Sequence, residues 1–588
     1  MNYYFGIDRY SLVTMGFLSL SLMLTSCTKK EIDPSLSAGT SGSLTSSRGL
    51  SNAELKIGTT QEFENLNPLI MTMSATNYMF RMVGRTLVVL DAEGKWVPQL
   101  AKSIPSLENG EAKIVDVNGK KKIVAHWEIL ENAKWSDGKP VVCADFALSR
   151  KIAASPNVAI GEKETFTQVE KIEFDVQNPK KCIFTYEKAR WDFARLAQFY
   201  ALPSHLEEEV FNKFGSQPEG YEKNTNFTKN PTLAGLYNGP YVISEVKLGD
   251  YVAFTPNPHF YGESPKIKKV LVKLIANTGT LEANLRSGTI DMISTLGMGF
   301  DQALAFDKKV QLENLPFTVT FTPSIIYEHI DLNLDLAVLK DLRVRKALVH
   351  AIDRENLVKS LFEGKQQAAV HFVSPKDPWF VDPAKIPALR YSKREAEKLF
   401  DEAGWKLNSS DGFRYKDGKK LSLAFMTTAG NKTRELVQTY LQEQWKAAGV
   451  EVVIKNEPAR VFFSETTKKR KFEGMAMYAW VSSPENNPRS TLHSLSIPSE
   501  KNSWSGQNQP GFSDKRMDAA IEAMDLEFDP KKRLELAAEM QRIYVEQVPV
   551  IPLYYRSDVS VVPKSLKNYR VPGHQFAETN EIEKWTLE

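Results

Sequence analysis

The stretch LSLAFMTTAGNKTRELVQTYLQEQWKAAGVEVVI at residues 421–454 decides the fold class of this chain. Its first five residues and its last five, 450–454, are mostly apolar or β-branched, which predicts two strands. Residues 431–448 between them predict a helix that ends at Gly449. The apolar residues of this helix share one face: Leu436, Val437, Tyr440 and Leu441. A strand, a helix and a strand in succession form a parallel crossover, so we expect an α/β fold.

Helices in the flanking sequence support the same class. Residues 341–364 predict two helices in tandem, with Asp353 capping the second. The segment SKRE at 392–395 has the form of a capping box and predicts the start of another helix. We therefore expect strands and helices to alternate from about Leu55 to the C-terminus.

Length and composition limit the classes of protein that fit. The chain has 588 residues, which is more than one hydrophobic core normally supports, so two or more domains are expected. The hydrophobic share of 42% and the charged share of 25% are globular values. The net charge is +3 with both signs mixed, which argues against nucleic acid as a partner.

The N-terminus predicts export. An apolar run at 12–24 has about 13 residues, too few to span a bilayer but typical of a signal peptide. The run ends in LTSC at 24–27, which resembles a bacterial lipobox; this resemblance implies lipidation of Cys27. A Ser- and Gly-rich tether at 28–53 follows. Thr28, where an Asp would favour the inner membrane, implies an anchor in the outer membrane or at the cell surface. The alternative is a plain signal peptide.

The chain has three cysteines, too few for a disulfide framework or a zinc ribbon. With Cys27 assigned to the anchor, Cys143 and Cys182 remain. We expect them to be two buried small hydrophobes. An oxidising compartment would also allow them to pair, and this alternative stays open.

No catalytic motif stands out in the sequence. It contains no Gly-x-Ser-x-Gly, His-Glu-x-x-His, phosphate-loop or dinucleotide-binding pattern, and its eight histidines are scattered. Glu328, His329 and His350 could serve as acid–base groups, but we interpret them as strand and helix residues. We therefore expect a binding protein with no cofactor and no metal. A secreted hydrolase is the alternative from another class.

Eight groups of motifs occur in a fixed order over about residues 55–570. They are NLNP at 65–68, GKWVPQLA at 94–101, WSDGKP at 135–140 with ADF at 144–146, NGPY at 238–241, NP and FY at 257–261, RSGTID at 286–291, DLRVRKA at 341–347 with AIDR at 351–354, and VPVIPLYY at 548–555. In this order they resemble the family-5 extracellular solute-binding proteins of ABC importers, typified by oligopeptide- and dipeptide-binding proteins. The turn-forming motifs among them, such as WSDG and NGP, have structural explanations and do not mark a site.

The resemblance implies an α/β, two-lobed periplasmic-binding-protein fold of type II with a hinged cleft. It implies lobe I at 54–92, 195–325 and 546–588, an extra domain inserted in lobe I at 93–194, and lobe II at 326–545. The implied function is an extracytoplasmic, lipid-anchored, monomeric receptor. It would bind oligopeptides in the cleft and deliver them to the permease subunits of an importer.

The site predicted by this resemblance lies in WVSSPENNP at 480–488. Peptide-binding relatives place an Asp three residues after the Trp, where it pairs with the α-amine of the peptide; here Ser483 stands in that place. Glu485 could supply the charge instead. The candidate ligand-binding residues are Trp480, Ser482, Ser483, Glu485, Asn486 and Trp504. Because Ser483 departs from the pattern, a nickel chelate, a sugar or a modified peptide remains an alternative ligand, and a signalling role without import remains an alternative function.

Overall fold

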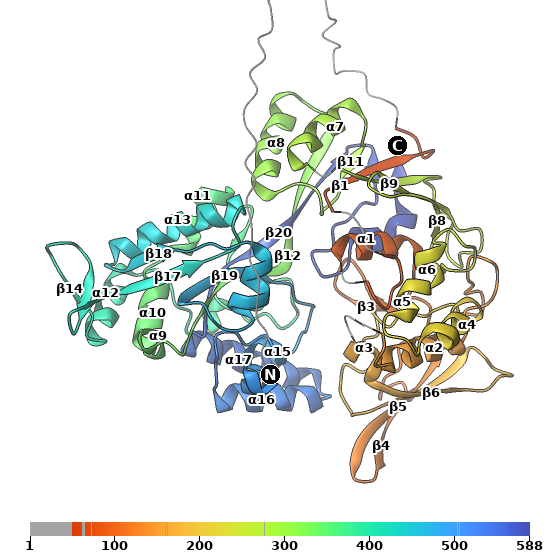
Figure 1. Cartoon of the computed structure of the whole chain (residues 1–588), viewed down its shortest axis with the longest axis horizontal. Coiled ribbons are helices and arrows are strands. Elements are labelled where there is room, and N and C mark those ends of the chain that lie inside the picture. Colours follow the sequence, from red (N-terminus) through yellow and green to blue (C-terminus); the bar gives the residue numbers. More distant parts are fainter. Residues whose placement is uncertain are drawn as a thin grey trace, which may run out of the picture. The chain divides into compact units, whose positions relative to one another are not determined.

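The computed structural model describes residues 50–588 except 62–64, 72, 159, 161–162, 276, 503 and 505 (Figure 1). The predicted signal peptide, Cys27 and most of the predicted tether lie outside the described residues. The helices are α1 (Ser74–Val83), α2 (Cys143–Ala154), α3 (Lys163–Thr167), α4 (Ser204–Phe214), α5 (Gly220–Asn224), α6 (Asn226–Lys229), α7 (Leu281–Ser287), α8 (Phe300–Leu312), α9 (Ala337–Lys340), α10 (Leu342–His350), α11 (Arg354–Phe362), α12 (Lys393–Glu402), α13 (Lys432–Ala447), α14 (Ala459–Val461), α15 (Arg489–Leu492), α16 (Lys515–Leu526) and α17 (Pro530–Gln547).

A sheet of eleven strands organises the chain. Its order is β18 (Glu451–Ile454), β17 (Ser422–Met426), β19 (Gly474–Trp480), β12 (Phe317–Leu332), β20 (Val550–Pro563), β11 (Met292–Ile293), β1 (Leu55–Thr59), β10 (Val270–Leu274), β9 (Tyr251–Pro256) and β8 (Tyr241–Lys247), with β13 (Gln367–Ala368) beside β20. A second sheet contains β4 (Ala112–Val117), β5 (Lys120–Glu128), β7 (Lys181–Tyr186) and β6 (Val169–Phe174). The short strands pair as β2 (Val88–Leu90) with β3 (Trp96–Pro98), β14 (Lys406–Leu407) with β15 (Arg414–Lys416), β15 with β16 (Lys419–Lys420), and β21 (Leu566–Lys567) with β22 (Thr586–Leu587).

Two long antiparallel strands, β12 and β20, are shared by both halves of the main sheet (Figure 1). The register of their pairing shifts between Pro323 and Tyr327. On one side of this irregularity β12 pairs with β19, and on the other side β20 pairs with β11. The chain enters one half of the sheet through β12 and leaves it through β20, so any bending of one half against the other acts on this pair of strands.

Each half of the sheet has its own hydrophobic core. One core joins Leu55 of β1 to Trp127 of β5, so the second sheet packs into it. The other core gathers Ile330 of β12 and Trp445 of α13, among others. The expected boundaries of the lobes and of the inserted domain stay a prediction.

The predicted crossover at 421–454 is confirmed. Strands β17 and β18 are parallel, and α13 connects them. Within α13, Val437 and Leu441 are fully buried, as expected, but the expectation for Leu436 is wrong because its side chain is 56% exposed. The helical periodicity placed it at the margin of the apolar stripe, and the neighbouring elements do not cover that margin.

The predicted helix starts are also confirmed. The tandem helices are α10 and α11, and the carboxylate of Asp353 accepts a hydrogen bond from the backbone N–H of Asn356 at 2.9 Å. At the start of α12, the Ser392 hydroxyl accepts from the N–H of Glu395 at 3.3 Å. Each cap satisfies one of the N–H groups that a helix start leaves without an intrahelical partner.

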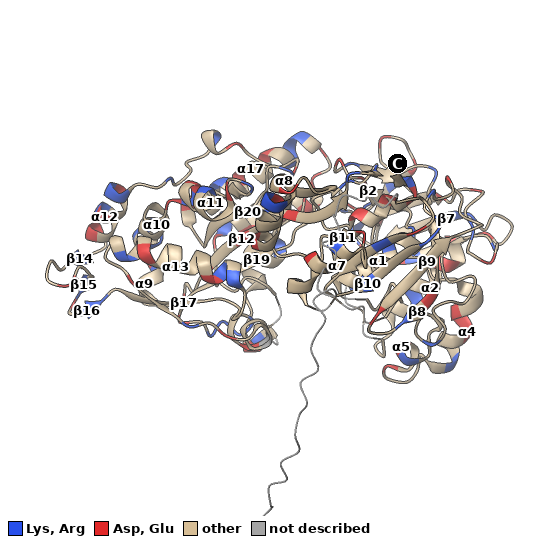
Figure 2. Cartoon of the chain, turned by 90° about the horizontal axis from the view of Figure 1, so that it is seen from above, with Lys and Arg blue, Asp and Glu red and all other residues tan. Residues whose placement is uncertain are grey.

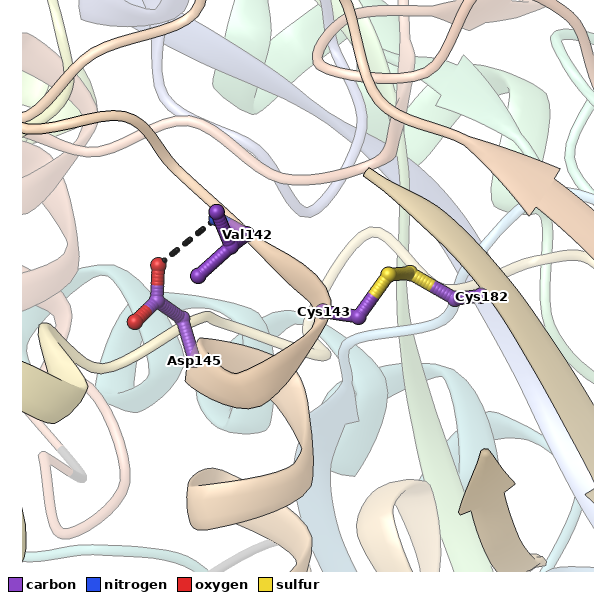
Figure 3. The surroundings of a disulfide bond; sticks show 4 residues. All are labelled: Val142, Cys143, Asp145 and Cys182. Atoms are coloured by element: carbon purple, nitrogen blue, oxygen red, sulfur yellow. Dashed lines mark hydrogen bonds between the residues drawn. A yellow bond between two sulfur atoms is a disulfide. The ribbon is translucent and has the colours of Figure 1, made fainter. Parts of the chain in front are cut away.

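Cys143 and Cys182 form a disulfide, which corrects the expectation of two unpaired buried thiols (Figure 3). Cys143 begins α2 and Cys182 lies on β7, with their Cα atoms 5.6 Å apart. A separation of this size suits a disulfide. Two residues beyond Cys143, the Asp145 carboxylate accepts from the backbone N–H of Val142 at 2.9 Å. The bond and this cap fix the start of α2 against the second sheet.

The turn motifs act as the sequence indicated. In WSDG, Gly138 has a φ of +87°, and its N–H donates to the carbonyl of Trp135 at 2.9 Å. In NGPY, a Cβ added at Gly239 would lie 2.5 Å from the carbonyl carbon of Val83, so only glycine fits there. These motifs position backbone and do not form a site.

The positions of Lys and Arg are interspersed with those of Asp and Glu along the described part of the chain (Figure 2). This agrees with the net charge of +3. None of the helices between residues 50 and 588, in the part that the structure describes, is long and apolar enough to cross a membrane.

Candidate functional site

The candidate site lies where β12 and β19 meet after the irregularity. Alternate residues of a strand point to the same face, so Tyr327, His329 and Asp331 share one face of β12. Their partners on β19 complete this face, because Trp480 stands opposite Tyr327 and Tyr478 stands opposite His329. We call these five residues the polar–aromatic face.

Three aromatic rings surround the imidazole of His329. Its ring centroid lies 4.9 Å from that of Tyr327, 4.5 Å from that of Tyr478 and 6.1 Å from that of Trp480. The rings of His329 and Trp480 are nearly parallel, with an angle of 9° between their planes. The His329 side chain is completely buried in this enclosure.

Several polar atoms of the face have no hydrogen-bond partner among the described residues. They include both ring nitrogens of His329 and Oδ1 of Asp331, although Nε2 and Oδ1 lie 3.4 Å apart. The other carboxylate oxygen, Oδ2, accepts from the Tyr478 hydroxyl. Native proteins pair most buried polar atoms, and those left over point to a bound molecule, a water or a functional role.

The Tyr478 hydroxyl is held in its protonated form. Burial, and after it the charge of Asp331, raises the pKa of Tyr478 well above its usual range. The hydroxyl therefore stays a donor, and Asp331 retains one oxygen that can accept from another molecule.

On the opposite face of β12, two arginines balance the charge of Glu328, although its Oε2 has no hydrogen-bond partner among the described residues. Glu328 is completely buried, and its carboxylate lies 2.6 Å from Nε of Arg434 and 2.7 Å from Nη2 of Arg556. Burial alone would raise its pKa, but Arg556 and Arg434 outweigh burial and hold the pKa below the usual range. Because Glu328 and His329 point to opposite faces of the strand, they do not form an acid–base pair.

The loop after β19 carries most of the residues predicted from the sequence. The Ser482 hydroxyl donates to the carbonyl of Ser483 at 3.2 Å, and Asn486 is exposed. The carboxylate of Glu485 forms an ion pair with Arg195, and the Glu485 N–H donates to the Asp377 carboxylate at 2.8 Å. Glu485 has a φ of +54°, which fixes the turn of this loop.

The structure brings only some of the predicted residues together. Trp480 belongs to the polar–aromatic face, and residues 481–486 follow it directly. Trp504 is half-buried, and its backbone N–H donates to the backbone carbonyl of Ser499 at 2.8 Å. In the part of the chain that the structure describes, Trp504 makes no ring contact with the face. Its role in binding stays a prediction.

Sequence reasoning missed Tyr327, His329 and Asp331 as site residues. A partial signal was present, because Tyr327, His329 and Asp331 stand at alternate positions near the end of the strand. Such a pattern predicts one face of a strand that is not ordinary core.

A cavity of about 700 Å³ lies elsewhere, between α11, β13 and residues 374–376. Lys359, Lys365 and Lys376 line it, and none of the five residues of the polar–aromatic face does. Among residues 50–588, as far as they are described, no three His, Cys, Asp or Glu side chains group so that they could hold a metal ion.

Comparison with known proteins identifies the class. The family described as "Bacterial extracellular solute-binding proteins, family 5 Middle" matches residues 95–503. Since this is more than half of the chain, the protein belongs to that family of ABC-importer solute-binding proteins. The recognition of the family from its ordered motifs is thereby confirmed.

Relatives align over nearly the whole length. The oligopeptide-binding protein AppA of Bacillus subtilis is 25% identical over 97% of both chains, and the nickel-binding periplasmic protein of Escherichia coli is 24% identical over 86% of this chain and 90% of its own. Among solved structures, the oligopeptide-binding protein of Thermus thermophilus complexed with a pentapeptide has a TM-score of 0.69 at 27% identity, covering 91% of this chain and 96% of that one. These similarities confirm the two-lobed, type II fold.

Proposed function

We propose that this protein is the receptor of an ABC importer and binds oligopeptides outside the cytoplasm. The observation that carries the proposal is the match over 97% of both chains with an oligopeptide-binding protein. The peptide-bound structure from Thermus thermophilus, at 27% identity, supports the same ligand class. The receptor binds and releases its ligand unchanged and catalyses no reaction.

The polar–aromatic face suits a peptide. A peptide main chain carries alternating donors and acceptors, and the free oxygen of Asp331 together with the ring nitrogens of His329 offers partners for both kinds. Trp480 adds apolar area beside these groups, which suits side chains of mixed character. Burial strengthens each of these hydrogen bonds by excluding water.

Native mass spectrometry of the protein as purified, followed by calorimetric titration with pentapeptides and nonapeptides of mixed sequence, tests the proposal. We expect a saturable, one-to-one complex with at least one of the peptides and no cleavage of it. Absence of binding across the panel, or the appearance of peptide fragments, would refute it.

A chelated metal ion is a second candidate ligand. His329 favours it, because a ring nitrogen without a hydrogen-bond partner can complete the coordination of a metal that a chelator brings in. The nickel-binding periplasmic relative supports this candidate. Titration with nickel–histidine in place of a peptide separates the two ligands.

The proposal includes a lipid anchor at Cys27, a monomeric state and partnership with permease subunits. Detergent partitioning of the native protein and of Cys27→Ala tests the anchor. We expect the native protein in the detergent phase and the variant in the aqueous phase. Equal partitioning would refute lipidation.

A further inference from the structure

The ring of Trp191 contacts two cationic side chains, one four residues along the chain and one far away in the sequence. The guanidinium carbons of Arg195 and Arg533 each lie 4.2 Å from the centroid of its ring. The ring of Trp379 lies 5.7 Å away, and the backbone N–H of Trp191 donates to the backbone carbonyl of Asp525 at 3.4 Å. Cations over an indole face attract the ring electrostatically.

Arg195 also forms the ion pair with Glu485. Both side chains are about four-fifths buried, at 21% and 20% exposure, so salt screens this pair less than a surface pair. The N–H of Glu485 is in turn fixed by Asp377, at 2.8 Å. A single guanidinium thus contacts both the Trp191 ring and the loop that carries the predicted ligand residues.

Asp525, at the end of α16, holds the same surface together. Its carboxylate accepts from Nδ2 of Asn487 at 2.6 Å and from Nη2 of Arg489 at 2.8 Å. The loop after β19 and the end of α16 therefore form one continuous surface. We call the residues of this surface the socket: Asp377, Trp379, Glu485, Asn487, Arg489, Asp525 and Arg533.

The connectivity of the chain shows that these contacts join the two halves of the main sheet. Residues 190–195 precede β12, whereas every residue of the socket lies between β12 and β20. The chain reaches the socket only through these two strands, whose pairing is irregular at Pro323 to Tyr327. Bending at the irregularity would pull residues 190–195 out of the socket.

We propose that residues 190–195 form a latch, in which Trp191 and Arg195 dock into the socket and hold the two halves together. The cation–ring contacts and the partly exposed ion pair are individually weak, so the latch closes reversibly. Because Glu485 belongs to both the latch and the ligand loop, closing the latch also fixes that loop.

Cross-linking of the full mature chain in the absence of ligand measures the latch. Lys188→Cys and Leu526→Cys place exposed thiols beside Trp191 and Asp525, and a short bis-maleimide joins them when the halves meet. Cys143 and Cys182 are bonded to each other and do not react. Adding Trp191→Ala or Arg195→Glu should slow cross-linking about fivefold. Glu187→Gln, an exposed charge change in the same segment, should leave the rate unchanged.

A charge swap keeps the test decisive if a single variant folds poorly. Arg195→Glu combined with Glu485→Arg should restore most of the cross-linking rate that Arg195→Glu loses. Equal rates in all variants, or a swap that is as slow as Arg195→Glu alone, would overturn the latch. Since no ligand is present, that result would leave the proposed peptide binding untouched, and a failure to bind peptides would leave the latch untouched.

Discussion

Two buried acids of this molecule have opposite surroundings. Glu207 of α4 is completely buried, and its carboxylate accepts from the Tyr221 hydroxyl at 2.7 Å, the Thr225 hydroxyl at 2.6 Å, and the backbone and side-chain amides of Asn226 at 3.0 Å. Asp331 of β12 is 99% buried as well, but one of its oxygens has no hydrogen-bond partner among the described residues.

The difference separates scaffold from site. A buried carboxylate with a full set of donors stabilises the fold and has nothing left to offer a ligand. Asp331 has one carboxylate oxygen without a hydrogen-bond partner, and the neighbouring imidazole of His329 has two such nitrogens. Buried polar atoms of this kind lower the stability of the fold until another molecule supplies a hydrogen bond. Burial therefore marks both regions alike, and only the hydrogen-bond count distinguishes them.

The largest expected effect is at Glu207, the buried acid whose carboxylate has a full set of hydrogen-bond donors. Glu207→Ala should lower the free energy of unfolding by about 3–5 kcal/mol, because it leaves the hydroxyls of Tyr221 and Thr225 and the amides of Asn226 buried without their acceptor. Urea unfolding measures this change. Glu209→Ala, at an exposed position on the same helix, is the control and should change it by less than about 0.5 kcal/mol. Equal effects would contradict the distinction.

An intermediate effect is expected at Glu485, which is neither fully buried nor free. Glu485→Gln should weaken the binding of a peptide with a free α-amine by about 1.5–3 kcal/mol, the contribution of a charged hydrogen bond. Calorimetry with the same peptide in free and N-acetylated form provides the measurement and its control. Should both forms bind the variant as they bind the native protein, Glu485 acts in the latch alone.

The substitution His329→Phe tests whether the polar–aromatic face serves binding more than stability. Since the two ring nitrogens have no partner, an apolar ring of similar shape should change the free energy of unfolding by less than about 1 kcal/mol. Peptide affinity should nevertheless fall about tenfold, or about 1.4 kcal/mol. The adjacent variant Glu328→Gln is the matched control, because it leaves Arg434 and Arg556 undercompensated and should destabilise the fold. If His329→Phe destabilises as much as Glu328→Gln, His329 belongs to the scaffold.

The sequence predicted most of the fold because the elements that decide it are local. The parallel crossover at 421–454, the caps at Asp353 and Ser392, and the glycine turns depend on periodicity and backbone geometry within a few residues. The disulfide was not predicted, because the approach of α2 to β7 depends on packing between residues 39 positions apart.

The candidate site was predicted less completely for the same reason. Trp480 and the loop after it were found from a motif that is continuous in sequence. The face that includes Tyr327, His329 and Asp331 arises only when β12 pairs with β19, about 150 residues later. The ion pair between Glu485 and Arg195 could not be predicted from local sequence either, because the two residues are 290 positions apart.

The last expected effect depends on pH and concerns Asp377 in the socket. Burial, together with the nearby charge of Glu485, raises the pKa of Asp377 to about 6. Between pH about 4 and 6 the folded protein thus keeps a proton that the unfolded chain has lost. The stability that this carboxyl contributes is complete below pH about 4 and is lost as the pH rises through about 6. Asp377→Asn cannot ionise, so its melting temperature relative to the native protein should rise over this range. The exposed Asp382→Asn should show no such trend, and parallel pH profiles for Asp377→Asn and the native protein would mean that Asp377 ionises as freely in the folded protein as in the unfolded chain.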